Sequence, residues 1–329
     1  MPPNKRSSAR APRASGRLRG GLVLVSALVL AVAGAALYTW HGAVTSALTG
    51  GSDQPQSLDP SFFANGACVA YAATSGDRGK TVFLDAGHGG IDPGGVGTTE
   101  NGGTIYEGDE TLPVELDTMS ILRESGYRVV VSRTGETTVL RLGSSDVDNG
   151  LLTLQGAHDD VAARAQCAND AHADALVGIY YDASSSSSDA GSITAYDAAR
   201  PFSSSNLKLA DLVQRDVLAG MNAQGWGIPD DGVQTDSTLG SLDGSPSSGG
   251  LAQEAASYGH LMELGPAMTG FFTTPSIMPG VIVEPLYLTD PFEGSIANTA
   301  GGQMTIARGI ALAVEQFLAP SSTSTTSTG

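Results

Sequence analysis

The chain is short of positive charge, and this shortage limits what it can bind. Its 329 residues include 17 Lys and Arg against 34 Asp and Glu, a formal net charge of −17. Beyond residue 52 the imbalance is larger, because eleven basic residues there face all 34 acidic ones. Nucleic-acid binding needs clustered cations that neutralise phosphates. We therefore expect no nucleic-acid partner.

Cysteine is also scarce, and the two that are present permit one disulfide at most. Cys68 and Cys167 both follow the apolar N-terminal segment, in the part of the chain that we expect to be exported. A bond between them would close a loop of about 100 residues, which on the chain-entropy model stabilises a fold by up to about 4.7 kcal/mol. Two unpaired buried thiols are the alternative.

The N-terminal segment has no acidic residue before Asp53, and part of it has no charge at all. Six basic residues lie within residues 1–19, and residues 20–40 carry no charge. About 20 apolar positions can cross a hydrocarbon core of roughly 30 Å. A basic flank before such a run is typical of a cytoplasmic tail followed by a transmembrane anchor. A cleaved signal peptide is the alternative, since Ala33-Gly34-Ala35 resembles a cleavage site.

These features predict a single-pass protein of the cell membrane whose C-terminal part lies outside the cytoplasm, or a secreted protein if the segment is cleaved. Residues 41–79 are rich in Gly, Ser, Asp and Pro and are predicted to be an extracytoplasmic linker. Residues 80–319 are predicted to be the folded domain. Residues 320–329 form a tail rich in Ser and Thr, and no internal repeat is visible.

Residues 80–319 alternate between strand and helix patterns, and the chain is 41% hydrophobic, which supplies a large core. Strands are predicted at 81–84, 127–131, 175–179, 192–196 and 280–283, and helices at 114–124, 161–171, 209–217 and 306–317. The pattern predicts a single three-layer α/β domain with a twisted, mostly parallel sheet of about six strands flanked by helices, preceded by one transmembrane helix. Two long breaks, at 141–156 and 232–250, are predicted to be functional or mobile loops.

Two of the predicted strands end in residues that suit chemistry. The run Val82-Phe83-Leu84-Asp85-Ala86-Gly87-His88-Gly89-Gly90 brings a histidine into a glycine-rich turn. Glycines let the backbone approach a bound ion, and imidazole is a common metal ligand. Glu284 follows Val281-Ile282-Val283 directly, at the end of a strand where open α/β sheets bind ligands. An ordinary turn and a structural ion pair are the respective alternatives.

These phrases, with Glu107 ahead of a helix and a strand that ends in Ser132-Arg133, resemble the zinc-dependent N-acetylmuramoyl-L-alanine amidases of the cell wall over about residues 80–319. The resemblance implies that His88 and Glu107 bind zinc and that Glu284 transfers the proton. Zinc with an open position lowers the pKa of bound water to about 7 and polarises a carbonyl. The implied substrate is peptidoglycan, cleaved between the lactyl group of muramic acid and L-alanine.

The third zinc ligand of that family, a second histidine, is replaced in this chain. Tyr180 occupies the position, within Val177-Gly178-Ile179-Tyr180-Tyr181-Asp182. A phenol with a pKa near 10 is a poor zinc ligand, although a metal can favour the phenolate. Asp182 and His260 are the alternative third ligands. The second hypothesis for function is therefore a degenerate amidase fold that binds peptidoglycan or regulates without turnover.

The other acidic and histidine side chains are predicted to have structural roles. The acids of the first helix are expected on its solvated face: Glu110, Glu115 and Asp117. Asp109 or Glu110 would replace Glu107 as a ligand if the helix register differs. His158 and His172 are expected at the surface. Arg133 is expected to pair with a carboxylate at the end of its strand.

Overall fold

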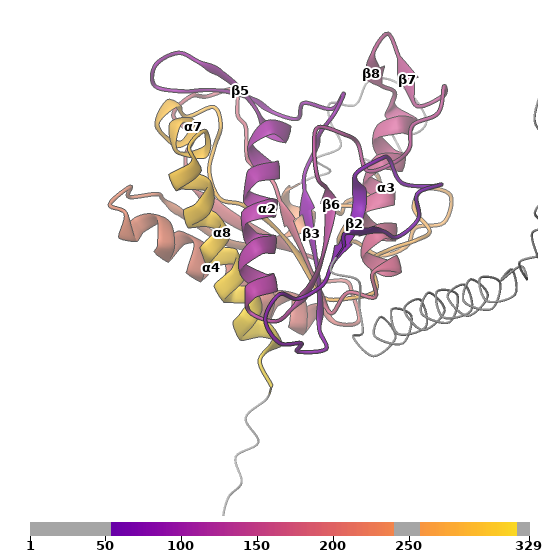
Figure 1. The fold of residues 1–329 in the computed structure, drawn as a ribbon. Coiled ribbons are helices and arrows are strands. Elements are labelled where there is room, and N and C mark those ends of the chain that lie inside the picture. Colours follow the sequence, from indigo (N-terminus) through magenta and orange to yellow (C-terminus); the bar gives the residue numbers. More distant parts are fainter. Residues whose placement is uncertain (1–53, 240–256, 321–329) are drawn as a thin grey trace, which may run out of the picture. The chain divides into compact units, whose positions relative to one another are not determined.

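An eight-stranded sheet forms the centre of the domain in the computed structural model, which describes residues 54–239 and 257–320 (Figure 1). The strand order is β1-β2-β6-β3-β9-β12-β10-β11. The strands are β1 (Gln56–Ser57), β2 (Ala67–Tyr71), β3 (Thr81–Ala86), β6 (Arg128–Arg133), β9 (Ala175–Ile179), β10 (Ser192–Tyr196), β11 (Asp230–Thr235) and β12 (Gly280–Glu284). The four central strands are parallel, whereas β2 and β10 run antiparallel to β6 and β12. The mostly parallel sheet flanked by helices is confirmed.

The sheet has eight strands rather than the predicted six because both of its edges extend further than the sequence patterns indicate. At one edge, β1 and β2 lie within residues 41–79, which the sequence analysis assigned to the linker. Val69 of β2 pairs with Val131 of β6, so this segment belongs to the sheet. At the other edge, β11 pairs with β10 although its sequence, Asp230–Thr235, lacks the apolar alternation of a half-buried strand.

Helices cover both faces of the sheet, as Figure 1 shows. They are α2 (Glu107–Glu124), α3 (Leu154–Asp170), α4 (Ser203–Ala223), α5 (Asp236–Leu239), α7 (Pro291–Ala297) and α8 (Ala300–Leu318). Helix α8 packs against both α2 and α4 over one face, where Val82 and Leu84 of β3 belong to the larger core. Phe83, between them in sequence, faces the second core together with residues of α3. This alternation follows from the two-residue period of a strand.

Short elements lie inside the predicted break at residues 141–156. A small hairpin, β7 (Val147–Asp148) and β8 (Leu151–Leu152), precedes α3, whose first residue is Leu154. The Thr153 side chain accepts a hydrogen bond from the Gly156 amide, so it caps the helix. A second hairpin, β4 (Val96–Thr98) and β5 (Thr104–Tyr106), leads into α2. Both hairpins therefore position the starts of long helices.

The two cysteines form a disulfide, so the alternative of two free thiols is wrong. Cys68 of β2 bonds to Cys167 of α3 across 99 residues, and both side chains are fully buried. The bond joins the edge of the sheet to the helix that covers one of its faces. Its closed loop contains β3, α2 and β6, which form one side of the parallel core.

Helix α2 buries acidic side chains that the sequence analysis placed in solvent. Glu110 accepts hydrogen bonds from Asn298 and Gln303, which lie between α7 and α8 or at the start of α8. Glu115 is fully buried, and its Oε1 accepts hydrogen bonds from the Ala86 amide and from Ser132. The prediction of a solvated face is wrong for both residues: Glu110 lies under α8, which packs on α2, whereas Glu115 faces the sheet between β3 and β6.

The predicted anchor at residues 20–40 lies outside the described residues, as do residues 1–19 and 321–329. Among the helices of residues 54–239 and 257–320, none has the length and apolar character that crossing a membrane requires.

Substituting Glu115 with Gln is expected to flatten the pH dependence of stability. Burial, reinforced by Asp85, raises the pKa of Glu115 to about 8. The folded state then retains a proton that the unfolded state releases above pH ~4.5. The free energy of unfolding therefore falls by up to ~1.4 kcal/mol per pH unit between pH ~5 and ~8 through this group. Urea denaturation at pH 5 and pH 8 measures the difference.

Glu124→Gln, at an exposed position of the same helix, is the matched control for this experiment. The control variant is expected to show the pH dependence of the wild type. If Glu115→Gln shows that same dependence, the buried carboxyl does not carry the proton.

Candidate active site

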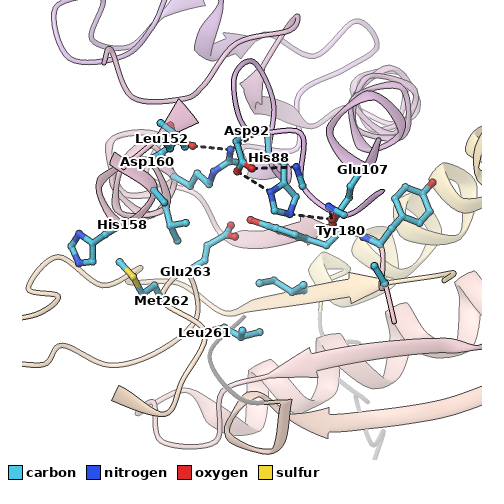
Figure 2. Close-up of a pocket in the computed structure, with 18 of the residues that line it drawn as sticks. His88, Asp92, Glu107, Leu152, His158, Asp160, Tyr180, Leu261, Met262 and Glu263 are labelled. Atoms are coloured by element: carbon cyan, nitrogen blue, oxygen red, sulfur yellow. Dashed lines mark hydrogen bonds and ion pairs between the residues drawn. The ribbon is translucent and has the colours of Figure 1, made fainter. Parts of the chain in front are cut away.

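A pocket of about 510 Å³ lies at the carboxyl ends of the central parallel strands and is shown in Figure 2. It brings together His88 after β3, Glu107 at the start of α2, Tyr180 and Asp182 after β9, and Glu284 at the end of β12. Helix α3 and residues 261–263 complete its walls. The predicted candidates thus share one pocket, His260 excepted. Parallel strands deliver their C-terminal residues to one edge, which explains the convergence.

His88 is held in a strained turn between two carboxylates. Its φ angle of 59° is in the left-handed region, and the glycines that flank it permit the turn. The Nδ1 atom lies 2.8 Å from Asp92 Oδ2, and Nε2 lies 3.2 Å from Glu107 Oε2. Burial lowers the pKa of His88, but Glu107 and Asp92 outweigh it and raise the pKa to about 10. In the absence of a cation, the imidazole is therefore protonated.

Asp92 is a site residue that the sequence analysis missed. It binds the imidazole nitrogen that faces away from Glu107, which fixes the ring and leaves Nε2 directed at Glu107. A carboxylate in this position orients a metal-binding histidine and increases its basicity. The available signal was an acid four residues after His88 within the same glycine-rich turn.

Glu107 is fixed by backbone amides on both sides of its carboxylate. Its Oε1 accepts a hydrogen bond from the Tyr181 amide at 2.9 Å, and Oε2 accepts one from the Gly95 amide at 2.8 Å. Its position as the first residue of α2 adds the favourable field of the helix N-terminus. A Cβ at Gly94 would lie 2.6 Å from the His88 ring, so only glycine permits this close approach.

His88 and Glu107 fit two donors of one zinc ion. Zinc bonds to nitrogen and oxygen of about 2.0–2.2 Å place tetrahedral ligands roughly 3.3–3.6 Å apart, close to the 3.2 Å found here. A third donor is not in place. Among the described residues, the only three His, Cys, Asp or Glu side chains with donor atoms all within 4.8 Å of one another are Asp197, Asp236 and His260, which lie elsewhere. The predicted fallback His260 is therefore committed to a different cluster.

The Tyr180 hydroxyl points into a buried acidic cluster, while its ring packs against the His88 ring in a T-shaped contact with 5.5 Å between the centroids. Its hydroxyl donates to Asp85 Oδ2 at 3.1 Å, and Figure 2 shows the ring extending towards Glu263 and away from Glu107. Burial, Asp85 and Glu263 all hold the pKa of Tyr180 well above its usual value. The phenol therefore retains its proton, which disfavours the phenolate that zinc binds.

Glu263 and Arg164 are further site residues that the sequence analysis did not identify. Both are buried in the pocket wall, and Arg164 Nη1 donates to Asp85 Oδ1 at 2.7 Å. Burial, together with Asp85, keeps the pKa of Glu263 well above its usual value, so this carboxyl is neutral. Arg164 was detectable as a charged residue within the apolar pattern of its helix. Glu263 had no such signal, since it lies outside any predicted element.

Glu284 combines burial with access to the pocket. Its side chain lies at the end of β12, and burial followed by the charges of Asp182 and Glu107 raises its pKa to about 8. A carboxyl with a pKa near neutrality exchanges protons readily, as general acid–base catalysis requires. Asp182, the other predicted fallback ligand, lies beside Glu284 and interacts with it.

Of the smaller expectations, the surface position of His158 was wrong, whereas the exposure of His172 and the pairing of Arg133 with a carboxylate are confirmed. His158 lines the pocket, where its Nε2 contacts the Phe271 carbonyl at 2.9 Å, whereas His172 is exposed as expected. Arg133 lies 3.6 Å from Glu136, but most of its hydrogen bonds go to backbone carbonyls of the His88 turn and of α2. The guanidinium therefore supports the His88 turn.

The comparisons with known proteins agree on one family. Residues 82–316 match a family model described as N-acetylmuramoyl-L-alanine amidase. The germination-specific N-acetylmuramoyl-L-alanine amidase of Bacillus subtilis strain 168 is 30% identical over 105 residues, 32% of this chain and 40% of that relative. The alignment thus spans less than half of the relative's length.

Solved structures share the fold. The CwlD amidase from Clostridioides difficile, in complex with the GerS lipoprotein, matches with a TM-score of 0.52 and 19% identity over 73% of this chain and 98% of its own. Cwp6 from Clostridium difficile matches with a TM-score of 0.50 and 21% identity, over 75% of this chain and 30% of its own. At these identities the likeness shows the architecture alone.

Substitutions at Tyr180 are expected to separate a metal ligand from a packing residue. Tyr180→Phe removes only the hydroxyl that donates to Asp85, so zinc affinity is expected to stay within about twofold of the wild type. Tyr180→His is expected to raise zinc affinity at least tenfold by adding a third donor. Isothermal titration of the metal-free protein with zinc measures both. A large loss of affinity in Tyr180→Phe would show that the phenol is a ligand.

Proposed function

The chain belongs to the N-acetylmuramoyl-L-alanine amidase family, and we propose that it hydrolyses peptidoglycan at the amide between the lactyl group of muramic acid and L-alanine. One observation carries the proposal: His88, Glu107 and the buried Glu284 converge on a single pocket. The pocket also combines these polar groups with an apolar wall that includes Leu154 and Met262. Such a surface suits a substrate that alternates amides with methyl groups.

His88 and Glu107 would hold a zinc ion, with Asp92 orienting the imidazole and two backbone amides orienting the carboxylate. Bound there, zinc supplies a polarised amide carbonyl and a water of lowered pKa. The protein contributes a rigid pair of ligands and a nearby carboxylate. With two protein ligands, the remaining positions are open to water and substrate.

Glu284 would move the proton in the reaction. As the carboxylate it accepts a proton from the attacking water, and as the acid it delivers that proton to the amine of L-alanine as the amide bond breaks. Its burial and the neighbouring acids Asp182 and Glu107 raise the pKa towards neutrality, so both forms are accessible. Metal binding and proton transfer are thus assigned to different side chains.

A membrane-tethered location accompanies this function. Residues 20–40 would anchor the chain in the cytoplasmic membrane, with the catalytic domain outside and facing the cell wall. Cleavage of the same segment would release the enzyme instead.

The replacement of the second histidine supports an alternative function, peptidoglycan binding or regulation without turnover. The observation behind it is the hydrogen bond from Tyr180 to Asp85, which commits the side chain at the third-ligand position. The two functions differ in metal content and in product. Zinc in the dialysed protein that is lost in His88→Ala, together with hydrolysis of muropeptides, supports the enzyme. Substrate binding with neither supports the alternative.

Replacing Glu284 with Gln is expected to abolish turnover without loss of zinc. Removing a general acid–base group costs roughly 10²–10⁴-fold in rate, while the ligands stay in place. Release of L-alanine-terminated peptides from purified peptidoglycan measures the rate, and elemental analysis measures zinc. Glu293→Gln is the control, because Glu293 is a buried glutamate outside the pocket whose pKa is also raised, to about 7. Persistent hydrolysis in Glu284→Gln contradicts the assigned role.

The uncleaved anchor predicts that the full 33.4 kDa chain sediments with the membrane fraction. Immunoblotting of fractionated cells measures its apparent mass. A variant in which a cleavable export signal replaces residues 1–40 is expected to appear in the medium. A product about 4 kDa smaller in the wild type, found outside the membrane fraction, would show that the segment is a signal peptide.

A further inference from the structure

Two aspartates lie side by side at the end of the sheet that is opposite to the pocket. Strands β10 and β11 are parallel, and Tyr196 pairs with Thr235 at the last position of the register. The next residue of each strand is an acid, Asp197 and Asp236, so both leave the sheet at the same end. Because β10 runs antiparallel to β12, this end is the opposite edge from Glu284. Both aspartates are buried, with exposed fractions of 0% and 1%.

His260 completes a three-donor cluster. Its Nδ1 lies 2.8 Å from Asp197 Oδ2 and 3.4 Å from Asp236 Oδ2. One donor atom of each of the three residues lies within 4.8 Å of the other two. The imidazole is partly open to solvent, with 23% of its side-chain surface exposed. The cluster is therefore compact, and one side of it is accessible to water.

Donor atoms in this cluster lack hydrogen bonds although they are buried. Among the described residues, no donor with hydrogen-bond geometry reaches Asp197 Oδ2 or Asp236 Oδ1, and His260 Nδ1 makes no hydrogen bond despite its short contact. The opposite oxygens are occupied, since Asp197 Oδ1 accepts from the amides of Ala199 and Arg200, and Asp236 Oδ2 from that of Leu261. Each carboxylate is thus fixed on one side and unsatisfied on the other.

The nearby cation does not neutralise the pair. Arg200 directs its guanidinium to the carbonyls of Leu264, Gly265 and Ser276. Among the described residues only His260 forms ion pairs with these carboxylates, and one imidazole cannot balance two buried negative charges. A divalent cation or a shared proton would therefore stabilise the cluster.

We propose that Asp197, Asp236 and His260 bind a divalent transition-metal ion, for which zinc is the best candidate, at a site separate from the pocket. An imidazole nitrogen with two carboxylate oxygens suits zinc, whereas calcium and magnesium prefer oxygen ligands alone. Water would have access to such an ion from the open side of His260. The hydrogen bonds from the backbone amides orient the ligands as in other metal centres.

The ion would fasten a segment of the pocket wall to the sheet. Leu261, Met262 and Glu263 follow His260 directly and line the pocket. Asp197 and Asp236 belong to the ends of two strands, so a bound ion joins three chain segments at one point. Its role is structural, because no reacting group of the proposed amidase lies in the cluster.

The metal content of the full-length chain tests this proposal. After purification and dialysis, plasma mass spectrometry is expected to find about one zinc equivalent less in His260→Gln and in Asp236→Asn than in the wild type. His88→Ala removes the pocket histidine, and the combination His88→Ala with His260→Gln is expected to hold the least zinc. His172→Gln, at an exposed histidine elsewhere, is the control with wild-type content.

Thermal denaturation in the His88→Ala background provides a second readout that does not involve turnover. A chelator is expected to lower Tm by about 5 °C there, and zinc to restore it, because an ion bound only to the folded state stabilises it. In the double variant His88→Ala/His260→Gln, neither chelator nor zinc is expected to change Tm. The proposal would be overturned if all variants held the same amount of zinc and the chelator did not change Tm. A proton shared between the two aspartates would then explain the cluster.

Anomalous scattering at the zinc edge from crystals of the wild-type chain decides the matter if the variants do not fold. A peak between Asp197, Asp236 and His260 supports the site, and its absence from zinc-soaked crystals overturns it. A peak at this cluster with none near His88 would contradict the proposed zinc chemistry of the pocket and would still support the second site. The two sites are therefore tested independently.

Discussion

A buried arginine determines how the pocket is built. Arg164 of α3 donates to Asp85 Oδ1, to Asp160 Oδ2 and to the carbonyls of Ala86 and His88. One guanidinium thus joins a helix, the end of β3 and the turn that bears His88. Removing one partner of such a buried pair costs about 3–5 kcal/mol because it leaves a charge unpaired. The left-handed conformation of His88 persists because these contacts, with those of Arg133, fix the turn on both sides.

The same network explains the environment of Tyr180. Asp85 accepts from Arg164 through one oxygen and from Tyr180 through the other, so its carboxylate is satisfied. A histidine at position 180 directed at a metal ion would leave the second oxygen without this donor. The tyrosine and the neutral Glu263 are therefore parts of one polar cluster inside the pocket wall. The change at the third-ligand position is accommodated by its surroundings, not isolated in an otherwise ordinary site.

Strand periodicity and strand ends allowed much of the architecture to be predicted. The central strands, the helices that cover them and the shared position of His88 and Glu284 follow from apolar runs that stop at polar residues, whereas Glu107 was identified through the resemblance to the amidases. Edge strands were missed for different reasons: β11 has little apolar pattern of its own, whereas β2 is a short apolar run inside a segment rich in Gly, Ser, Asp and Pro that was assigned to the linker. Helix α2 begins at Glu107 rather than near Val114, since its first turns bury polar side chains.

Contacts between residues far apart in the chain could not be predicted from local sequence patterns. The burial of Glu110 depends on α8, which lies almost 200 residues further along the chain, and that of Glu115 depends on β3 and β6, which α2 packs against. Glu263 and His260 occupy a segment without regular structure, and nothing near them in sequence indicates which strands they contact. The one long-range pairing that the sequence suggested was the disulfide, because two cysteines leave a single possible partner for each, and the structure decides it against the alternative of two free thiols.

That disulfide closes a loop of the chain that contains some of the pocket residues and excludes others. His88 and Glu107 lie inside the ring closed by Cys68 and Cys167, whereas Tyr180 and Glu284 lie outside it. If a protease cuts the backbone once between the two cysteines, the disulfide keeps the fragments tethered, and no part of the His88 turn can diffuse away. A cut after Cys167 has no such safeguard. Resistance to proteolytic damage is therefore built into one half of the site and absent from the other.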